Sequence, residues 1–286
     1  MSKFIKSGFA DEISSNLDKQ IEGLKKCNIG YVEMRGVNGK SLVDHSAAEA
    51  RDVKRKLDDN GIKLSSIGSP IGKIDISNDF MPHLELFKHT LELAEILEAP
   101  YIRMFSFYNE NGIERDKYRE GVMERWNKFC DAAAGYKVRL LHENETGIYG
   151  MTAESCLDLV TTIGYDRMGL IFDPANYCNN DIETYPHSWN LTKDYTDYIH
   201  IKDAVGWNVC PAGYGNGHIE EILKDLYDRG FEGFLSIEPH LAHFEGFDKL
   251  QRDIIPNMAT EGGEKTFIIA NNALNIILEK GGYKYE

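Results

Sequence analysis

The sequence lacks the features that mark secreted and membrane proteins. Among its 286 residues there are only five cysteines, an odd number, and no two of them form a CxxC pair. This usage is typical of buried free thiols in a reducing compartment, so we expect a cytoplasmic protein. No apolar run approaches the roughly 20 residues that cross a membrane, and the N-terminus carries no long apolar segment. We therefore expect neither a membrane helix nor a signal peptide.

Positive charge is also scarce. Lys and Arg number 32 against 46 Asp and Glu, which gives a formal net charge of −14. Such a field repels phosphodiester backbones, so we expect no nucleic-acid partner. Hydrophobic residues make up 42% and aromatic residues 11% of the chain, enough to fill a sizeable core. The length suits one domain over residues 1–286.

Strand patterns and helical patterns alternate along the chain. Ser46-Ala-Ala-Glu49 has the form of a capping box and predicts the start of one helix. The predicted strands are Phe4–Ala10, Tyr31–Met34, Lys63–Ile67, Tyr101–Phe107, Val138–Glu143, Met168–Asp173, Tyr198–Lys202 and Phe234–Glu238. No GxGxxG follows the first strand, which removes the usual reason for an open doubly wound sheet. We predict an α/β protein folded as a single-domain (β/α)8 TIM barrel.

Polar side chains stand at the ends of four of these strands. In Tyr198–Asp203 the apolar Ile199 and Ile201 fall on one face, and an imidazole and an ammonium fall on the other. The same alternation turns the four end residues toward the mouth of the barrel, where barrel active sites lie. These residues are Glu143, Asp173, His200 and Glu238.

Three carboxylates in one small volume repel one another unless a cation lies among them. Oxygen ligands with one imidazole suit Mn²⁺ or Mg²⁺ best, with Zn²⁺ or Co²⁺ as alternatives. Each carboxylate taken alone could instead cap the following helix or pair with a lysine. Their common position at four strand ends favours the metal site.

Five motifs extend this pattern into a family resemblance. They are Leu141-His-Glu-Asn144, Phe172-Asp-Pro-Ala-Asn176, His200-Ile-Lys-Asp203, Gly213-Tyr-Gly-Asn-Gly217 and Ser236-Ile-Glu-Pro239. Together they resemble the xylose isomerase-like TIM-barrel superfamily, and within it the sugar phosphate isomerase/epimerase group. The resemblance spans nearly the whole chain. It implies that Glu143, Asp173, His200 and Glu238 bind one divalent metal ion.

The resemblance also implies a reaction, namely isomerisation or epimerisation of a sugar, sugar phosphate or polyol. The metal would hold the carbonyl and the adjacent hydroxyl and stabilise a cis-enediolate. Glu143 and Glu238 would be the catalytic acid and base, one removing the proton next to the carbonyl and the other returning it. The expected substrate-binding residues are Glu33, Arg103, Asn176 and Lys202. Because such barrels often associate, a homo-oligomer is a further expectation.

Arg103 and Lys202 could receive a phosphate or carboxylate, or serve as buried ion-pair partners. Three departures leave the substrate open. Asn176 stands where ketose 3-epimerases of the family usually carry a histidine, the loop 204–208 has no arginine, and Gly215-Asn-Gly217 replaces the common Gly-Glu-Gly.

Other activities compete with isomerisation. A dehydratase-like lyase that acts on a keto-inositol would share the metal site and the enolate. An AP endonuclease-like DNA repair enzyme would need three zinc ions and additional histidines. The corresponding places read Ser-Ile-Gly-Ser, Phe-Ser-Phe-Tyr and Gly-Trp-Asn-Val-Cys-Pro, which argues against this activity, as does the net charge of −14. A non-catalytic sugar-binding barrel is the remaining alternative.

Overall fold

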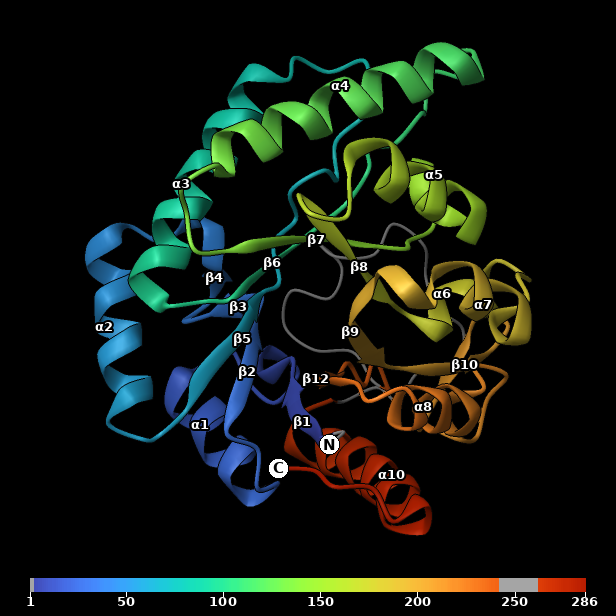
Figure 1. Ribbon diagram of the computed structural model, residues 1–286. Helices are drawn as coiled ribbons and strands as arrows, with labels where there is room; N and C mark the ends of the chain where they lie inside the picture. The colour runs from blue at the N-terminus through green and yellow to red at the C-terminus, as the bar shows by residue number, and fades with distance from the viewer. Residues whose placement is uncertain (1–2, 242–261) are drawn as a thin grey trace.

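A parallel β-barrel forms the centre of the protein. The computed structural model describes residues 3–241 and 262–286 (Figure 1). Its eight-stranded sheet has the order β1-β12-β9-β8-β7-β6-β5-β2, and every neighbouring pair is parallel. The strands are β1 (Lys3–Gly8), β2 (Tyr31–Met34), β5 (Lys63–Ile67), β6 (Tyr101–Met104), β7 (Arg139–Glu143), β8 (Met168–Phe172), β9 (Thr196–Ile201) and β12 (Glu232–Ile237). The predicted TIM barrel is confirmed.

The barrel is nearly closed between its first two strands. β1 and β2 stand at the two ends of the sheet order and lie next to each other without a shared ladder. Part of the free edge of β1 pairs instead with the C-terminal residues. Phe4 N donates to Lys284 O at 2.9 Å and Lys6 N donates to Glu286 O at 2.8 Å. The two ends of the chain therefore meet at the base of the barrel (Figure 1).

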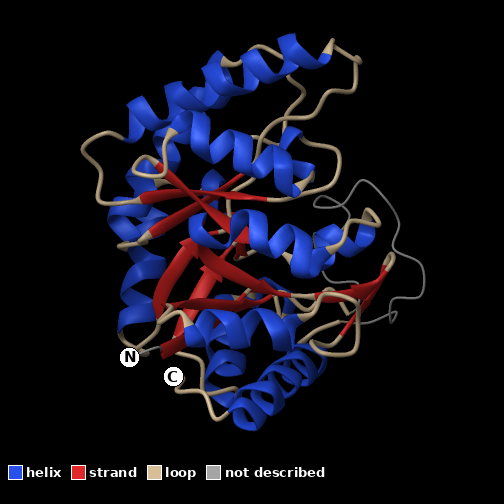
Figure 2. Cartoon of the chain, turned by 45° about the vertical axis from the view of Figure 1, so that its right-hand side comes forward, coloured by secondary structure: helices blue, strands red, loops and turns tan. Residues whose placement is uncertain are grey.

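Helices surround the strands, as Figure 2 shows. They are α1 (Leu17–Lys26), α2 (Ala47–Asp58), α3 (Met81–Leu97), α4 (Arg115–Ala133), α5 (Ala153–Ile163), α6 (Pro174–Asn179), α7 (Trp189–Thr192), α8 (Ile219–Asp228) and α10 (Glu264–Gly281). The predicted capping box is present, because Ser46 accepts from Glu49 N and Glu49 accepts from Ser46 N. These side chains satisfy amide groups that the first turn of a helix leaves without partners.

The strands differ from the prediction in three details. The first strand was expected to reach Ala10 but ends at Gly8, because a 3₁₀ turn begins at Ala10. The fourth strand was expected to reach Phe107 but ends at Met104, because Phe105 N and Phe107 N donate to the loop carbonyls Ile71 O and Gly72 O and not to a neighbouring strand. Two short antiparallel hairpins were not predicted. They are β3 (Gly36–Val37) with β4 (Lys40–Ser41), and β10 (Asp203–Val205) with β11 (Asn208–Cys210).

The interior of the barrel is built in layers by the period-two alternation of the strands. The lowest layer is an apolar cluster of Leu141, Ile171, Tyr198 and Phe234. Each of these residues lies two positions before a polar residue, on the same strand or directly after its end. Successive inward positions therefore lead from an apolar floor to a polar mouth.

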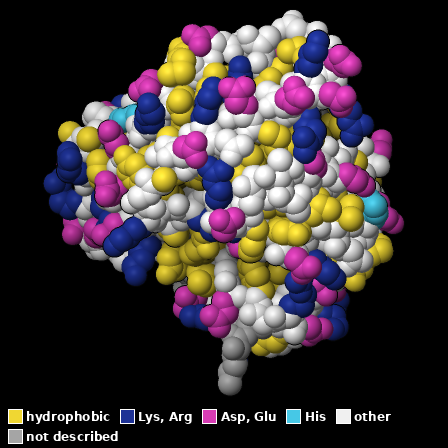
Figure 3. Space-filling view, turned by 45° about the horizontal axis from the view of Figure 1, so that its top comes forward, with side chains coloured by type: hydrophobic (Ala, Val, Ile, Leu, Met, Phe, Trp, Pro, Cys, Tyr) yellow, Lys and Arg dark blue, Asp and Glu magenta, His cyan; other side chains and the backbone are white. Residues whose placement is uncertain are grey.

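The remaining described features agree with an ordinary globular surface and core. All five cysteines are free, and four of them are buried. Lys and Arg side chains intermingle with Asp and Glu on the face seen in Figure 3. Within residues 3–241 and 262–286, none of the helices has the length and apolar character that crossing a bilayer requires. The assignment of the whole chain 1–286 to one domain stays a prediction.

Candidate metal centre

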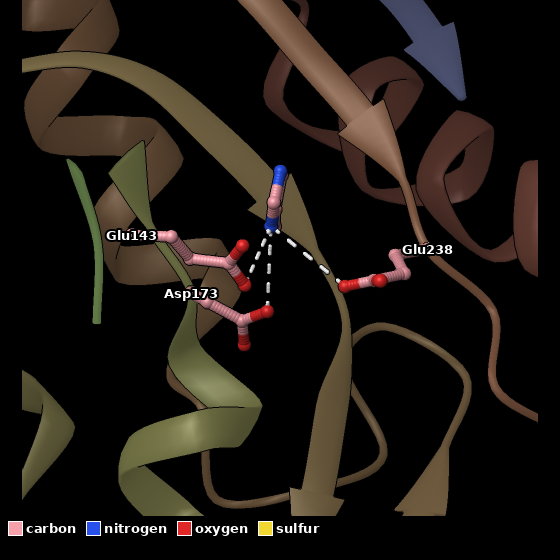
Figure 4. A group of neighbouring side chains, drawn as sticks. Glu143, Asp173 and Glu238 are labelled. Carbon is pink, nitrogen blue, oxygen red and sulfur yellow. Dashed lines mark ion pairs between the residues drawn. The ribbon is translucent and has the colours of Figure 1, made fainter. Parts of the chain in front are cut away.

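Four side chains from neighbouring strands converge at the mouth of the barrel. His200 Nδ1 lies 3.2 Å from Glu143 Oε1, 3.5 Å from Asp173 Oδ2 and 3.7 Å from Glu238 Oε2. One potential ligand atom from each residue lies within 4.8 Å of the others, and all four residues are buried. Figure 4 shows the three carboxylates pointing toward one another from different elements. The sequence-based set thus comes together in space, because parallel strands end at the same edge of the barrel.

The donor atoms of this cluster fit a divalent cation. Glu143 Oε2, Asp173 Oδ2 and His200 Nδ1 are buried and make no hydrogen bond, although Arg103 and Lys202 form ion pairs with the two carboxylate oxygens. Buried polar atoms without hydrogen bonds are rare in native proteins and often mark an ion or water. Three carboxylates and one imidazole are also the donor types that Mn²⁺, Mg²⁺ or Zn²⁺ accept. The four residues can therefore hold one such ion.

The electrostatics of the cluster favour added positive charge. Burial raises the pKa of Glu143, but His200 and Arg103 outweigh it and bring that pKa to about 2. Burial also raises the pKa of Glu238, yet Lys202 and other cations hold it well below its usual value. Burial lowers the pKa of His200, but Glu143 and Glu33 raise it well above the usual range. The carboxylates thus draw a proton onto the imidazole, and a bound metal ion would replace that proton.

Neighbouring asparagines hold two of the carboxylates in position. Asp173 Oδ1 caps α6 by accepting from Asn176 N at 2.9 Å, which leaves Oδ2 to face His200. Asn176 Nδ2 donates to Glu143 Oε1 at 3.1 Å. Asn144 joins the ends of β7 and β8 by donating to Asp173 O and accepting from Asp173 N, each at 2.9 Å. The structure places Asn176, expected to bind substrate, in contact with the candidate ligand Glu143.

Glu33 lies behind His200. Its Oε2 is 3.2 Å from His200 Nε2, and both side chains are fully buried. A carboxylate at one ring nitrogen fixes the tautomer and orientation of a histidine that binds metal through the other nitrogen. This position fits a role in orienting His200, and the substrate contact expected from the sequence stays a prediction.

Arg103 and Lys202 both reach the cluster. Arg103 Nη1 is 3.3 Å from Glu143 Oε2, and its Nη2 donates to Gly68 O at 3.2 Å. Lys202 Nζ is 2.8 Å from Asp173 Oδ2 and donates to Glu238 Oε2 at 2.9 Å. Both side chains are therefore ion-pair partners of the candidate ligands, one of the two roles left open by the sequence.

A second group beside the cluster was missed by the sequence analysis. Arg35 Nη1 donates to Glu238 Oε1 at 3.0 Å, and its Nε donates to Asp11 Oδ2 at 2.7 Å. Glu12, Glu238 and His240 also lie close enough to share an ion. Burial raises the pKa of Glu12 to about 8. Arg35 could have been found, because it is two positions after Glu33 and four after Tyr31, on the inward side of that strand.

Comparison with known proteins gives one family. The sequence model of a family described as xylose isomerase-like TIM barrel matches residues 21–254. The inosose isomerase of Bacillus velezensis is 22% identical over 241 residues, which cover 79% of this chain and 84% of that protein.

Solved structures give the same fold. A D-psicose 3-epimerase from Clostridium cellulolyticum H10, solved with D-tagatose, has a TM-score of 0.72 and 19% identity and covers 98% of this chain and 99% of its own. The IOLI protein, solved with a bound zinc atom, has a TM-score of 0.73 and 18% identity with the same coverage. At such identities these two structures show likeness of fold.

Proposed function

The chain belongs to the xylose isomerase-like TIM-barrel family, and from this premise we propose that it is a divalent-metal-dependent isomerase or epimerase of a sugar, sugar phosphate or related polyol. The convergence of four strand-end donors with three buried atoms that make no hydrogen bond carries the proposal. The inosose isomerase and the D-psicose 3-epimerase among its relatives support the substrate class.

The proposed ligands are Glu143, Asp173, His200 and Glu238. A divalent ion held there would act as a Lewis acid on a substrate carbonyl and stabilise the negative charge that develops beside it. Mn²⁺ or Mg²⁺ suits the oxygen-rich set, and the zinc atom in the IOLI structure makes Zn²⁺ a further candidate.

Glu143 and Glu238 are the proposed acid and base. Both pKa values lie below the usual range, so both carboxylates are ionised and can accept a proton near neutral pH. Glu143 Oε2 makes no hydrogen bond and has the more distant ion pair, 3.3 Å from Arg103 Nη1, whereas the two oxygens of Glu238 accept from Arg35 at 3.0 Å and from Lys202 at 2.9 Å. We therefore assign the first proton abstraction to Glu143 Oε2, with Glu238 returning the proton. General base catalysis of this kind contributes about 10²–10⁴-fold to the rate.

A proton-exchange screen in D₂O tests the proposal. The protein with Mn²⁺ is mixed with ketoses, keto-inositols and their phosphates, and mass spectrometry detects deuterium at the carbon next to the carbonyl. We expect exchange with at least one compound. Loss of water together with exchange would identify the dehydratase-like lyase instead. Binding of Mn²⁺ without exchange into any of these compounds would contradict an isomerase or epimerase.

Three variants test the two assigned glutamates. We expect Glu143→Gln and Glu238→Gln each to lower the exchange rate by 10²-fold or more, because each removes a proton acceptor. The matched control is Glu145→Gln, since Glu145 pairs with Lys73 at 2.9 Å and is outside the ligand set. Full exchange in both ligand variants would refute the acid and base assignment. Cytoplasmic location and oligomer formation stay predictions.

A further inference from the structure

Lys202 occupies an unusual place for a lysine. Its side chain is 5% exposed and follows Tyr198 and His200 on the inward face of β9. Its ammonium is 2.8 Å from Asp173 Oδ2 and 2.9 Å from Glu238 Oε2. These two oxygens also face His200 Nδ1, at 3.5 Å and 3.7 Å. We call them the inner oxygens, because they point to the centre of the four-residue cluster.

The neighbouring arginines contact different atoms. Arg35 Nη1 donates to Glu238 Oε1, and Arg103 Nη1 is closest to Glu143 Oε2. The oxygens of these two glutamates that face His200 are Glu238 Oε2 and Glu143 Oε1. The guanidinium groups therefore contact the outer oxygens, whereas the ammonium of Lys202 contacts the inner oxygens directly.

A divalent ion bound by the cluster would need the same inner oxygens. Metal–oxygen distances are about 2.0–2.6 Å, so the ion would lie within a few ångströms of the ammonium if Lys202 kept both contacts. Two cations at such a distance in a buried site repel each other strongly. Two carboxylates that lose both cations would equally repel each other. Once the imidazole of His200 has given up its proton, holding either the metal ion or the ammonium, but not both, avoids both penalties.

We propose that Lys202 is a built-in counter-cation of this centre. In the metal-free protein its ammonium neutralises Asp173 and Glu238 and keeps the ligand set assembled, and it leaves the inner oxygens when a divalent ion binds. The inference rests on the proposed metal centre and concerns Lys202 alone. Its consequence is that Lys202 weakens metal binding and makes the ion readily exchangeable, while the empty centre stays folded.

Calorimetric titration of the metal-free protein with Mn²⁺ tests the inference. Lys202→Met keeps the size of the side chain and removes its charge, so we expect its Kd for Mn²⁺ to fall by tenfold or more. We also expect the metal-free variant to melt at a lower temperature than the metal-free wild type. Added Mn²⁺ should raise the melting temperature of the variant more than that of the wild type. The matched control is Lys73→Met, since Lys73 pairs with Glu145 and contacts no candidate ligand oxygen in the described residues. Its Kd should equal that of the wild type.

The outcomes separate this inference from the proposed function. If wild type binds Mn²⁺ and Lys202→Met binds it no more tightly, the counter-cation role is wrong and the metal centre stands. If neither protein binds Mn²⁺, Mg²⁺ or Zn²⁺, the metal centre falls, and this inference with it. Should Lys202→Met not fold, a crystal structure of the wild type with Mn²⁺ decides. If Lys202 Nζ still contacts both inner oxygens in that structure, the inference is overturned, and its withdrawal from them would support it.

Discussion

Replacing Glu33 by glutamine tests how the barrel orients its histidine. Glu33 touches no other candidate ligand through its Oε2, which lies 3.2 Å from His200 Nε2. Glutamine keeps the shape and still accepts a hydrogen bond through its amide oxygen, but it carries no charge. The substitution therefore removes the charge behind the imidazole and leaves the four proposed ligands in place.

Two effects of this substitution oppose each other. Loss of a residue that supports a metal-binding histidine typically weakens metal affinity by about 10–100-fold. Glu33 also raises the pKa of His200, so its loss lets the imidazole shed a competing proton more easily. Glu143 raises the same pKa more strongly and remains, so we expect this gain to be the smaller effect. The net expectation is affinity weaker by about tenfold, which corresponds to about 1.4 kcal/mol.

The assay is calorimetric titration with Mn²⁺ at one pH, with wild type and variant compared side by side. Asp197→Asn is the matched control, because Asp197 also lies on β9 but pairs with Arg139 at 2.7 Å, at the opposite end of the strand from the cluster. Thermal unfolding without metal verifies that both variants fold. A Kd for Glu33→Gln within twofold of wild type, or equal shifts in both variants, would refute the orienting role of Glu33.

Two further predictions concern stability. His83 Nε2 accepts from Gly72 N at 2.7 Å, and burial lowers its pKa to about 4. The pKa of His83 in the folded protein is below its value of about 6.5 in the unfolded chain. Its contribution of about 3 kcal/mol to the free energy of unfolding is therefore complete above pH 6.5 and is lost as the pH falls toward 4. Between pH 7 and pH 4, the free energy of unfolding measured in urea should fall less in His83→Gln than in the wild type. An equal fall in both proteins would contradict this. The Asp203 carboxylate accepts hydrogen bonds from the backbone amides of Ala204, Gly213, Gly215 and Gly217. We therefore expect Asp203→Ala to lower the free energy of unfolding by about 3 kcal/mol and to make the loop 204–217 sensitive to proteolysis. A decrease below about 1 kcal/mol would argue against this role of Asp203.

Local chemistry explains why much of the barrel could be predicted. The capping box at Ser46 and the apolar stripes of the helices depend on residues within one or two turns of each other. The strand alternation in Tyr198–Asp203 likewise depends on neighbours alone, and it placed His200 and Lys202 inward as the structure does. The fourth strand was extended too far because Phe105 N and Phe107 N donate to a distant loop, for example Phe107 N to Gly72 O.

The four residues of the candidate site could be predicted from the sequence, but their hydrogen-bond and ion-pair partners could not. Parallel strands end at one edge, so identical parity at four strand ends was enough to bring Glu143, Asp173, His200 and Glu238 together. Arg35 has the same inward parity as Tyr31 and Glu33, but the alternation was not continued beyond Glu33. No local pattern indicated that Asn176 would hold Glu143.

The sequence by itself determined the alternation of strands and helices, the family and the four converging side chains, because these depend on periodicity and on short motifs. Tertiary structure alone decided which oxygen of each carboxylate faces the centre and which cation contacts it. Those contacts join residues far apart in the chain, such as Arg35 with Glu238 and Glu33 with His200. The side-chain rotamers in the close-packed barrel decide these contacts, and a pattern along the chain does not give the rotamer of each side chain.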